Sequence, residues 1–447
     1  MAGKAGAGLF STVLLLQHHF RHGLKMKNSE DINKPSYLKV VIFCLVIFET
    51  DGLITKLIGF DTVLGAWLFS FLMICFLFLS ILQMAKEKKF YEIKSFYYPI
   101  IAFFIFFAVS FISGNFIFVK PLKDWLPSLY AFIPIFIFYF LYFFKYTSKE
   151  VVWSFICVAI LISTLLIVDR ISNFAFLDDY QRRSAFFSLD IRRIVLLKNE
   201  VIFGFVTVVS LLIIGNRSTN EKKILIIIAA LLFLVQAFVM ESRMGFIAMG
   251  VGTLTIMYIK GLTKQVFRWY VVGFLGVVLV FPIVFSKHIE GLSNMSLHDS
   301  SSNISIRFET VSHFYDTYIQ SGGMGIGSMS SNGSVNNILN SEEHNNIVDA
   351  GAISSLFQFG PFGLLIWIVF TFKSIQACLQ YYRKTNNTDP YSAATFAFIL
   401  SFTLSPLPLS FFTASWCISV GGVLLYLMWF FQTEMMNNSK IDSQIRT

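Results

Sequence analysis

Long apolar segments alternate with short polar ones along most of the chain. Twelve such segments, each bounded by charged or turn-forming residues, lie near residues 38–57, 62–83, 96–114, 125–144, 151–168, 200–215, 224–240, 244–259, 269–286, 350–372, 392–413 and 415–431. Most of them approach the roughly 20 apolar residues that a helix needs to cross a bilayer. The pattern predicts an all-α polytopic membrane protein with about 12 transmembrane helices.

The first apolar segment is interrupted by Glu49 and Asp51. Charged residues inside a membrane span normally face a cavity or a partner helix. These two residues therefore either line something polar or mark the end of a short helix, and we favour the short helix.

The composition excludes a water-soluble chain. Of the 447 residues, 55% are hydrophobic and 14% are charged, whereas a soluble domain carries about 25% charge. The cysteines lack the short paired spacing of a zinc site or a disulfide framework, so we expect them to be packing residues and we expect no metal site or cofactor. They are Cys44, Cys75, Cys157, Cys378 and Cys417.

Basic residues gather in alternate loops. These loops contain Lys86, Lys88, Lys89 and Lys94, then Lys145 and Lys149, then Arg217, Lys222 and Lys223, then Lys260, Lys264 and Arg268, and finally Lys373, Arg383 and Lys384. Positively charged loops stay in the cytoplasm. The N-terminal tail (residues 1–36) and the C-terminal tail (residues 432–447) are therefore both predicted to be cytoplasmic.

The N-terminal tail has an apolar stretch at residues 9–16, which is too short to cross a membrane. It lacks a small-residue cleavage site that would indicate a signal peptide. Met26 opens a more ordinary cytoplasmic start, so whether residues 1–25 belong to the native chain stays open.

Two segments on the predicted outer side do not follow this charge rule. The loop of residues 169–198 contains Arg170 and the pairs Arg182–Arg183 and Arg192–Arg193, and the longest polar stretch, residues 287–349, is also predicted to be outside. Part of the net charge of +9 thus has no role in orientation. We interpret the outer arginines as indicating an anionic ligand rather than nucleic acid.

Three features near this outer side can carry chemistry. His344 lies between Glu343 and Asn345, just before an apolar segment, where a neighbouring carboxylate or amide can orient its imidazole. Arg243 lies in a tight outer turn, and Arg307 opens a predicted short helix that runs to about Tyr318. The glycines that follow this helix form a flexible stretch whose amides are expected to approach a phosphate, and they are Gly322, Gly323, Gly325 and Gly327.

Together these features have a recognisable order over about residues 199–375. An Arg-Gly turn, an Arg-led helix and a Gly-x-Gly stretch precede the string Glu343-His344-Asn345-Asn346-Ile347-Val348-Asp349-Ala350-Gly351, and Gly360-Pro361-Phe362-Gly363 lies inside the following span. The chain resembles the O-antigen ligase and polymerase superfamily of bacterial surface-polysaccharide assembly. That resemblance implies a lipid-dependent glycosyltransferase architecture in the inner membrane. A large periplasmic loop (residues 287–349) would separate helices 1–9 (residues 37–286) from helices 10–12 (residues 350–431).

The resemblance also implies a reaction. Family members transfer a saccharide from undecaprenyl diphosphate to a sugar hydroxyl, with inversion and without a metal. By position, Arg243 and Arg307 would contact the diphosphate and His344 would be the general base, with Glu343 or Asn345 orienting it. The secondary candidates for the diphosphate or an acidic sugar are Arg182, Arg183, Arg192 and Arg193.

Three functions remain open at this point. A polymerase would use a lipid-linked repeat unit as acceptor, together with a chain-length regulator, whereas a ligase would use the lipid A core. We favour the polymerase because the richness in Phe, Ile and Asn is typical of surface-polysaccharide gene clusters. The third reading is a lipid-linked saccharide flippase or transporter, but such proteins are often built of two matched halves, and the sequence has no internal repeat.

Overall fold

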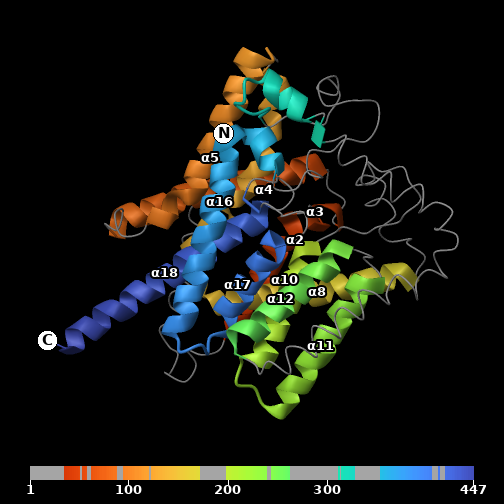
Figure 1. The fold of residues 1–447 in the computed structure, drawn as a ribbon, viewed down its shortest axis with the longest axis vertical. Coiled ribbons are helices and arrows are strands. Elements are labelled where there is room, and N and C mark those ends of the chain that lie inside the picture. The colour runs from red at the N-terminus through yellow and green to blue at the C-terminus, as the bar shows by residue number, and fades with distance from the viewer. Residues whose placement is uncertain are drawn as a thin grey trace, which may run out of the picture.

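The computed structural model describes residues 35–50, 53–57, 62–87, 94–119, 122–171, 198–238, 243–261, 311–312, 314–327, 353–404, 411–412 and 418–446. Within these ranges the chain is helical and contains no strand (Figure 1). By length and composition, five of the described helices can cross a membrane, and they cover Leu64–Glu87, Lys94–Ile117, Ser148–Val168, Ile353–Lys384 and Ile418–Asn437. The predicted helical membrane class is therefore confirmed at this level.

The helices follow the apolar segments of the sequence. They are α2 (Tyr37–Thr50), α3 (Leu53–Leu57), α4 (Thr62–Glu87), η2 (Lys94–Tyr97), α5 (Tyr98–Ile112), η3 (Ser113–Ile117), α6 (Leu122–Trp125), η4 (Pro127–Phe136), α7 (Ile137–Phe143), α8 (Ser148–Ile171), α10 (Lys198–Ile213), α11 (Thr219–Phe238), α12 (Arg243–Ile259), α16 (Ile353–Lys384), α17 (Pro390–Thr403) and α18 (Ile418–Arg446). Every predicted apolar segment contains a described helix except residues 269–286, which lie outside the described residues.

Local sequence signals set where several helices begin. The Thr147 hydroxyl accepts the Glu150 N–H at 3.2 Å, and the Glu150 carboxylate accepts the Thr147 N–H at 2.9 Å. Ser218 and Glu221 repeat this reciprocal capping box at the start of α11, at 3.3 and 2.9 Å. Such boxes satisfy amide groups that have no partner in the first turn of a helix.

The first apolar segment is divided as the short-helix interpretation expects. α2 ends at Thr50, and α3 begins at Leu53. The Glu49 carboxylate accepts the N–H of Thr55 at 3.0 Å and also the Thr55 hydroxyl. Glu49 therefore stabilises the first turn of α3 at the end of α2.

Small residues let α10 pack closely against its neighbours. α10 packs against α8, α11, α12 and α17. A Cβ atom at Gly204 would lie 2.5 Å from the Cβ of Ala159 in α8, and one at Gly252 in α12 would lie 2.7 Å from a methyl group of Val206. Glycine at these positions is what allows the helix backbones to approach, as is common between membrane helices.

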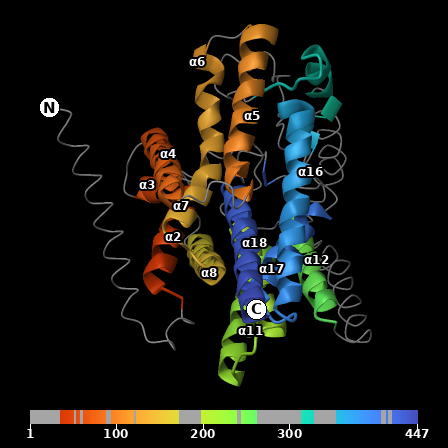
Figure 2. The same cartoon turned by 90° about the vertical axis from the view of Figure 1, so that its left-hand side faces the viewer.

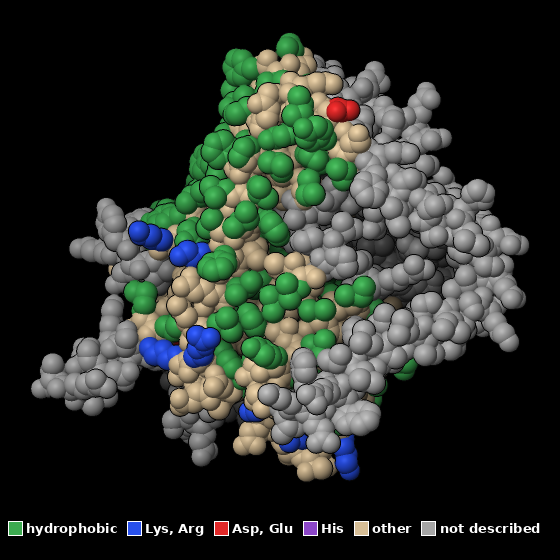
Figure 3. Space-filling model, in the orientation of Figure 1, with side chains coloured by type: hydrophobic (Ala, Val, Ile, Leu, Met, Phe, Trp, Pro, Cys, Tyr) green, Lys and Arg blue, Asp and Glu red, His purple; other side chains and the backbone are tan. Residues whose placement is uncertain are grey.

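A second group of helices surrounds α18. α18 packs against α5, α7, η4 and α16, while α4 packs against α7 and η4, and Figure 2 shows α5 and α16 rising together beside α18. Large apolar side chains of α4 and α5 point outward, among them Phe71 and Phe104. Figure 3 shows how apolar side chains cover this part of the surface. Such a surface is suited to contact with lipid rather than water.

Polar contacts group several helix ends into one basic face, which we define by Lys39, Lys145, Arg217 and Lys384. Lys145 lies 3.8 Å from the carboxylate of Glu87, and the Lys384 ammonium donates to the carbonyl of Met435 at 2.6 Å. The Arg217 guanidinium donates to the Tyr391 hydroxyl at 3.5 Å. These contacts join loops that the charge pattern places on the same side of the membrane.

Candidate functional site

Most of the predicted site residues lie outside the described residues. These are His344, Glu343, Asn345, Arg307, Arg182, Arg183, Arg192 and Arg193. Arg243 is the first residue of α12, although its side chain is outside the description. The described part of the candidate site is therefore the segment that follows Arg307 and the beginning of α16, the helix that follows His344.

The segment after Arg307 is helical and then turns sharply. We call its helical residues, 311–312 and 314–320, the loop helix. The predicted short helix ending near Tyr318 is confirmed over these residues. The glycines that follow all have positive φ angles: Gly322 at 64°, Gly323 at 78°, Gly325 at 102° and Gly327 at 80°. Residues with a Cβ atom are strained in this conformation.

The amides of these glycines are already used within the protein. The N–H groups of Gly322 and Gly323 donate to the carbonyls of Ile319 and Tyr318 at 2.9 and 3.2 Å. The N–H of Gly325 donates to the Ser321 hydroxyl at 3.1 Å, and that of Gly327 to the carbonyl of Gln358 at 2.7 Å. The prediction that these amides approach a phosphate is therefore wrong, because each hydrogen already has an acceptor.

α16 is broken where this stretch meets it. Phe359 (φ −122°, ψ 18°) and Gly360 (φ 63°, ψ −158°) leave the helical conformation just before Pro361. Proline has no N–H, so it cannot donate to the carbonyl four residues earlier, which is that of Phe357. The N–H of Ile326 donates to this carbonyl instead, at 2.8 Å. The glycine stretch thus supplies donors that the broken helix lacks.

The close approach explains why glycine is needed on both sides. A Cβ at Gly325 would lie 2.5 Å from the Gly360 nitrogen, and one at Gly360 would lie 2.4 Å from the Met324 carbonyl oxygen. A Cβ at Gly327 would lie 2.8 Å from the Cα of Ser110 in α5. The Ser113 hydroxyl of η3 also donates to the Gly325 carbonyl. We call residues 324–327 with residues 357–360 the glycine junction.

Apolar side chains seal the junction. Phe314 of the loop helix, Ile326 and Phe357 form a buried cluster. Next to it, the Phe359 ring lies 4.4 Å from that of Phe106 in α5 and 5.2 Å from that of Phe132 in η4. Figures 1 and 2 show the loop helix, in teal, beside the upper ends of α5 and α16. The loop helix, α5 and α16 are therefore held together at the glycine junction.

The junction limits how far two of the predicted site residues can lie from it. Arg307 precedes residue 311 by four positions, and His344 precedes Ile353 by nine. A fully extended chain covers about 14 Å and about 32 Å over these distances. α12, which Arg243 opens, lies lower than the loop helix in both ribbon views. The described backbone thus joins the segments that flank Arg307 and His344, but it does not bring the start of α12 to them.

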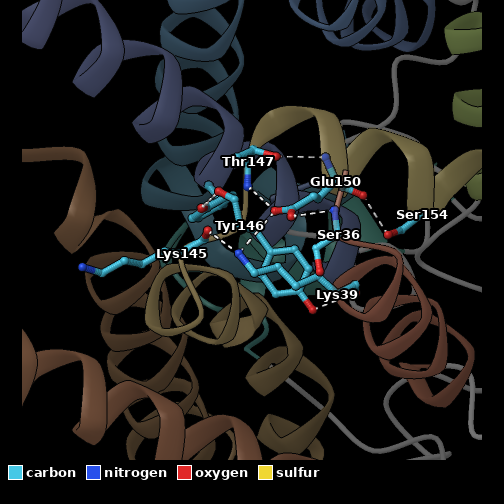
Figure 4. A network of polar contacts seen from close by, with 8 residues as sticks. Ser36, Lys39, Lys145, Tyr146, Thr147, Glu150 and Ser154 are labelled. Carbon is cyan, nitrogen blue, oxygen red and sulfur yellow. Dashed lines mark hydrogen bonds and ion pairs between the residues drawn. The ribbon is translucent and has the colours of Figure 1, made fainter. Parts of the chain in front are cut away.

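A second polar cluster, on the basic face, was not predicted from the sequence. The Lys39 ammonium lies 3.4 Å from the Glu150 carboxylate, and both side chains are almost fully buried (Figure 4). Lys39 also donates to the carbonyl of Lys145 at 2.9 Å, and its ammonium lies 5.4 Å from the centre of the Tyr146 ring. A lysine near the start of an apolar segment and a Thr-x-x-Glu capping box are both visible in the sequence, but local patterns cannot pair residues so far apart in the chain.

This cluster connects three helices. The Tyr146 hydroxyl donates to the carbonyl of Lys39 at 2.9 Å, and the Tyr426 hydroxyl of α18 donates to the carbonyl of Tyr146. Burial, together with the neighbouring Glu150 charge, raises the pKa of Tyr146 above its ordinary value. The neutral Tyr146 phenol and the hydrogen-bonded Lys39–Glu150 ion pair therefore fit a structural role, which is to join α2, α8 and α18.

Comparison of the chain with known protein families and with curated proteins gives no match.

Proposed function

We propose that the protein is a membrane glycosyltransferase that transfers an undecaprenyl-diphosphate-linked oligosaccharide to a sugar hydroxyl, acting as an O-antigen or capsular polysaccharide polymerase. The proposal rests on the order of the Arg243 turn, the Arg307 segment and the His344 string in the sequence. The observation that carries it furthest is the glycine junction, because it ties the segment after Arg307 to the helix after His344.

The residue types suit the reaction. A diphosphate leaving group gains negative charge as the anomeric bond breaks, and guanidinium groups fixed in a water-poor site stabilise that charge. The acceptor hydroxyl must lose a proton, which suits a neutral imidazole with an unperturbed pKa of about 6.5. In this proposal Arg243 and Arg307 bind the diphosphate, His344 is the base, and Glu343 or Asn345 orients it.

The proposed orientation puts the basic face in the cytoplasm of a bacterial cell and the glycine junction on the periplasmic side of the inner membrane. It is supported by the positive-inside rule and by the contacts that group Lys145, Arg217 and Lys384 with their neighbours on one face. Under this orientation the loop helix faces the compartment in which lipid-linked repeat units are polymerised.

The test uses the surface polysaccharide of a deletion strain that carries plasmid-borne variants. We expect His344→Ala and Arg307→Ala to lower long-chain polysaccharide at least 100-fold at equal protein level, because removing a general base costs about 10²–10⁴-fold in rate. His298→Ala, from the same predicted loop, and Arg383→Ala, next to Lys384 in the last turn of α16, are matched controls and should change little. Unchanged chain length in the two site variants would overturn the proposal.

The banding pattern of the deletion strain decides between the two acceptors. A single repeat unit on the lipid A core is expected from loss of a polymerase. Bare core with accumulated lipid-linked polymer would instead identify a ligase. Loss of any lipid-linked material from the outer leaflet would point to a flippase.

A further inference from the structure

Two cysteine side chains meet where α2 packs against α8. The thiols of Cys44 and Cys157 lie in hydrogen-bond contact with each other, and the Cys44 thiol also donates to the carbonyl of Ser154 at 3.5 Å. Both are free cysteines, of which Cys44 is buried and Cys157 is partly exposed. Cys75 and Cys378, the other cysteines in the described part of the chain, have no such thiol contact there. We call Cys44 and Cys157 the thiol pair.

Neighbouring contacts hold α2 and α8 in the register that brings the two sulfurs together. One turn or more toward the basic face, Lys39 of α2 pairs with Glu150 of α8 at 3.4 Å. Directly beside the thiol pair, the rings of Phe43 and Phe155 lie 6.1 Å apart in an edge-on arrangement. Contacts at successive turns of both helices therefore keep the thiols opposite each other.

The thiol pair lies beside a surface of α8 that is suited to contact with lipid. Cys157 is inside the candidate membrane span Ser148–Val168. Leu161 and Val168 follow it by four and eleven residues, which places them on the same face of the helix. They are 53% and 55% exposed. A molecule dissolved in the hydrocarbon can therefore reach Cys157, whereas a charged molecule in water is kept away from it.

Two thiols in contact can form a disulfide, in which the S–S bond is about 2.05 Å long. Rotation about the Cα–Cβ bonds of Cys44 and Cys157 supplies the movement that closes this distance. The attacking group in thiol oxidation is a thiolate, and a thiolate on Cys157 would accept a hydrogen bond from the Cys44 thiol. This contact lowers the cost of forming the charge in apolar surroundings.

The surroundings of the thiol pair favour a disulfide over a soft metal ion. Thiolates select ions such as Cu(I), but a monovalent ion held by two thiolates leaves a net negative charge. Charge in apolar surroundings is costly, whereas a disulfide is neutral. The apolar surroundings also restrict the oxidant, because the rate of thiol oxidation depends on access to the sulfur. A lipid-soluble two-electron acceptor of the quinone class meets this condition.

We propose that the thiol pair is a modification site at which a quinone dissolved in the membrane forms a disulfide between Cys44 of α2 and Cys157 of α8. Both S–H bonds break and one S–S bond forms. The two protons and two electrons that leave the thiols reduce the quinone to the quinol. This site does not depend on the proposed transfer reaction, so either proposal can fail without the other.

The test uses the full chain in sealed liposomes, with Cys75, Cys378 and Cys417 replaced by alanine and decylubiquinone as the oxidant. Remaining thiols are counted with a maleimide after unfolding, and linked peptides are identified by mass spectrometry. We expect both thiols to be lost, a Cys44–Cys157 peptide link that a reductant breaks, and one quinol for each chain oxidised. Two thiols that still react with the maleimide would overturn the proposal. If this variant does not accumulate, the wild-type chain is treated and mapped in the same way, and absence of the link overturns it.

A chain that keeps only Cys75 and Cys157 is the matched control. Both of these cysteines are partly exposed, but they lie on different helices and have no thiol contact, so no link should form between them. A link formed as readily there as in the thiol pair would show that contact is not required, and would overturn the proposal.

A charged oxidant tests the lipid route. Tetrathionate is a dianion that oxidises thiols from the water outside the liposomes. Each oxidant's rate with the folded chain is divided by its rate with the unfolded chain, which removes the difference in their intrinsic reactivity. We expect this ratio to be about 10-fold higher or more for decylubiquinone than for tetrathionate, because access limits the rate. Equal ratios would place the thiol pair in contact with water and overturn the lipid route.

Discussion

The N–H of Gly327 donates to the carbonyl of Gln358 at 2.7 Å, which joins a glycine-rich turn to a broken helix. With the bond from Ile326 to Phe357, it supplies donors to the carbonyls that precede the Gly360-Pro361 break. The glycines are thus required by backbone geometry rather than by a ligand. This relationship leads to the first prediction.

Gly325→Ala and Gly360→Ala should destabilise the junction by more than Gly322→Ala does. All three positions have positive φ, which costs about 1–2 kcal/mol for a residue with a Cβ. The first two would also force a Cβ within 2.5 Å of backbone atoms, whereas Gly322 has open space around it. Such overpacking adds about 1–3 kcal/mol. Thermal unfolding in detergent measures the difference, and equal losses at all three positions would contradict the account.

Lys39→Met should destabilise the protein by about 3–5 kcal/mol, because it leaves the buried Glu150 carboxylate without its cation. The double variant Lys39→Met with Glu150→Leu should recover most of this loss. Lys145→Ala is the control, since the ammonium of Lys145 is 64% exposed and its pair with Glu87 is worth about 0–1 kcal/mol. The measurement is chemical unfolding in detergent, and a double variant no better than the single would argue against the ion pair.

Asp389 supports a prediction about pH. Its carboxylate accepts the N–H of Ser392 at 2.7 Å and caps α17, while burial raises its pKa above the ordinary value. The native state then binds the proton more tightly than the unfolded chain does. This contribution to stability is present below the unfolded pKa of about 3.9 and is lost as the pH rises through the raised native value.

Asp389→Asn should therefore keep the cap without the cost of a buried charge. At pH 7 we expect its melting temperature to equal or exceed that of the wild type, and the advantage should shrink as the pH is lowered. Asp389→Ala removes the cap and should cost about 1 kcal/mol. Equal losses for Asn and Ala at pH 7 would show that the charge itself is needed.

The proposed orientation predicts the behaviour of reporter fusions. A fluorescent protein fused after Asn387, in the link between α16 and α17 on the basic face, should fluoresce because it folds in the cytoplasm. Alkaline phosphatase fused after residue 327 should be active because it reaches the periplasm. The reverse pattern would invert the assignment of the two faces while leaving the grouping of helix ends unchanged.

The sequence predicts the helices well because hydropathy and capping are local properties. Glu150 and Glu221 can be recognised as helix-capping residues from the motifs Thr-x-x-Glu and Ser-x-x-Glu alone. The partner of Glu150 is not, because Lys39 lies 111 residues away and the pairing depends on how α2 packs against α8. Long-range packing is the part of the fold that local patterns leave undetermined.

The candidate site shows the same difference between what local patterns predict and what depends on long-range packing. Gly360-Pro361 can be seen in the sequence inside an apolar segment. The break that it makes in α16 can be understood only together with Ile326 and Gly327, whose N–H groups donate to the carbonyls left free by the break. A glycine-rich stretch has the same composition whether it binds a phosphate or fits against a neighbouring backbone. The structure separates the two because it shows where each N–H points.

The break in α16 also couples the movement of the loop helix to that of the first turns of α16. Displacing the loop helix would remove the donors from the carbonyls of Phe357 and Gln358, in apolar surroundings beside Phe106 and Phe132. Each stranded carbonyl costs about 1–3 kcal/mol. Moving the loop helix by itself therefore costs the sum of both, about 2–6 kcal/mol. An opening that carries the first turns of α16 together with the loop helix avoids this cost, so the two segments are expected to move as one body.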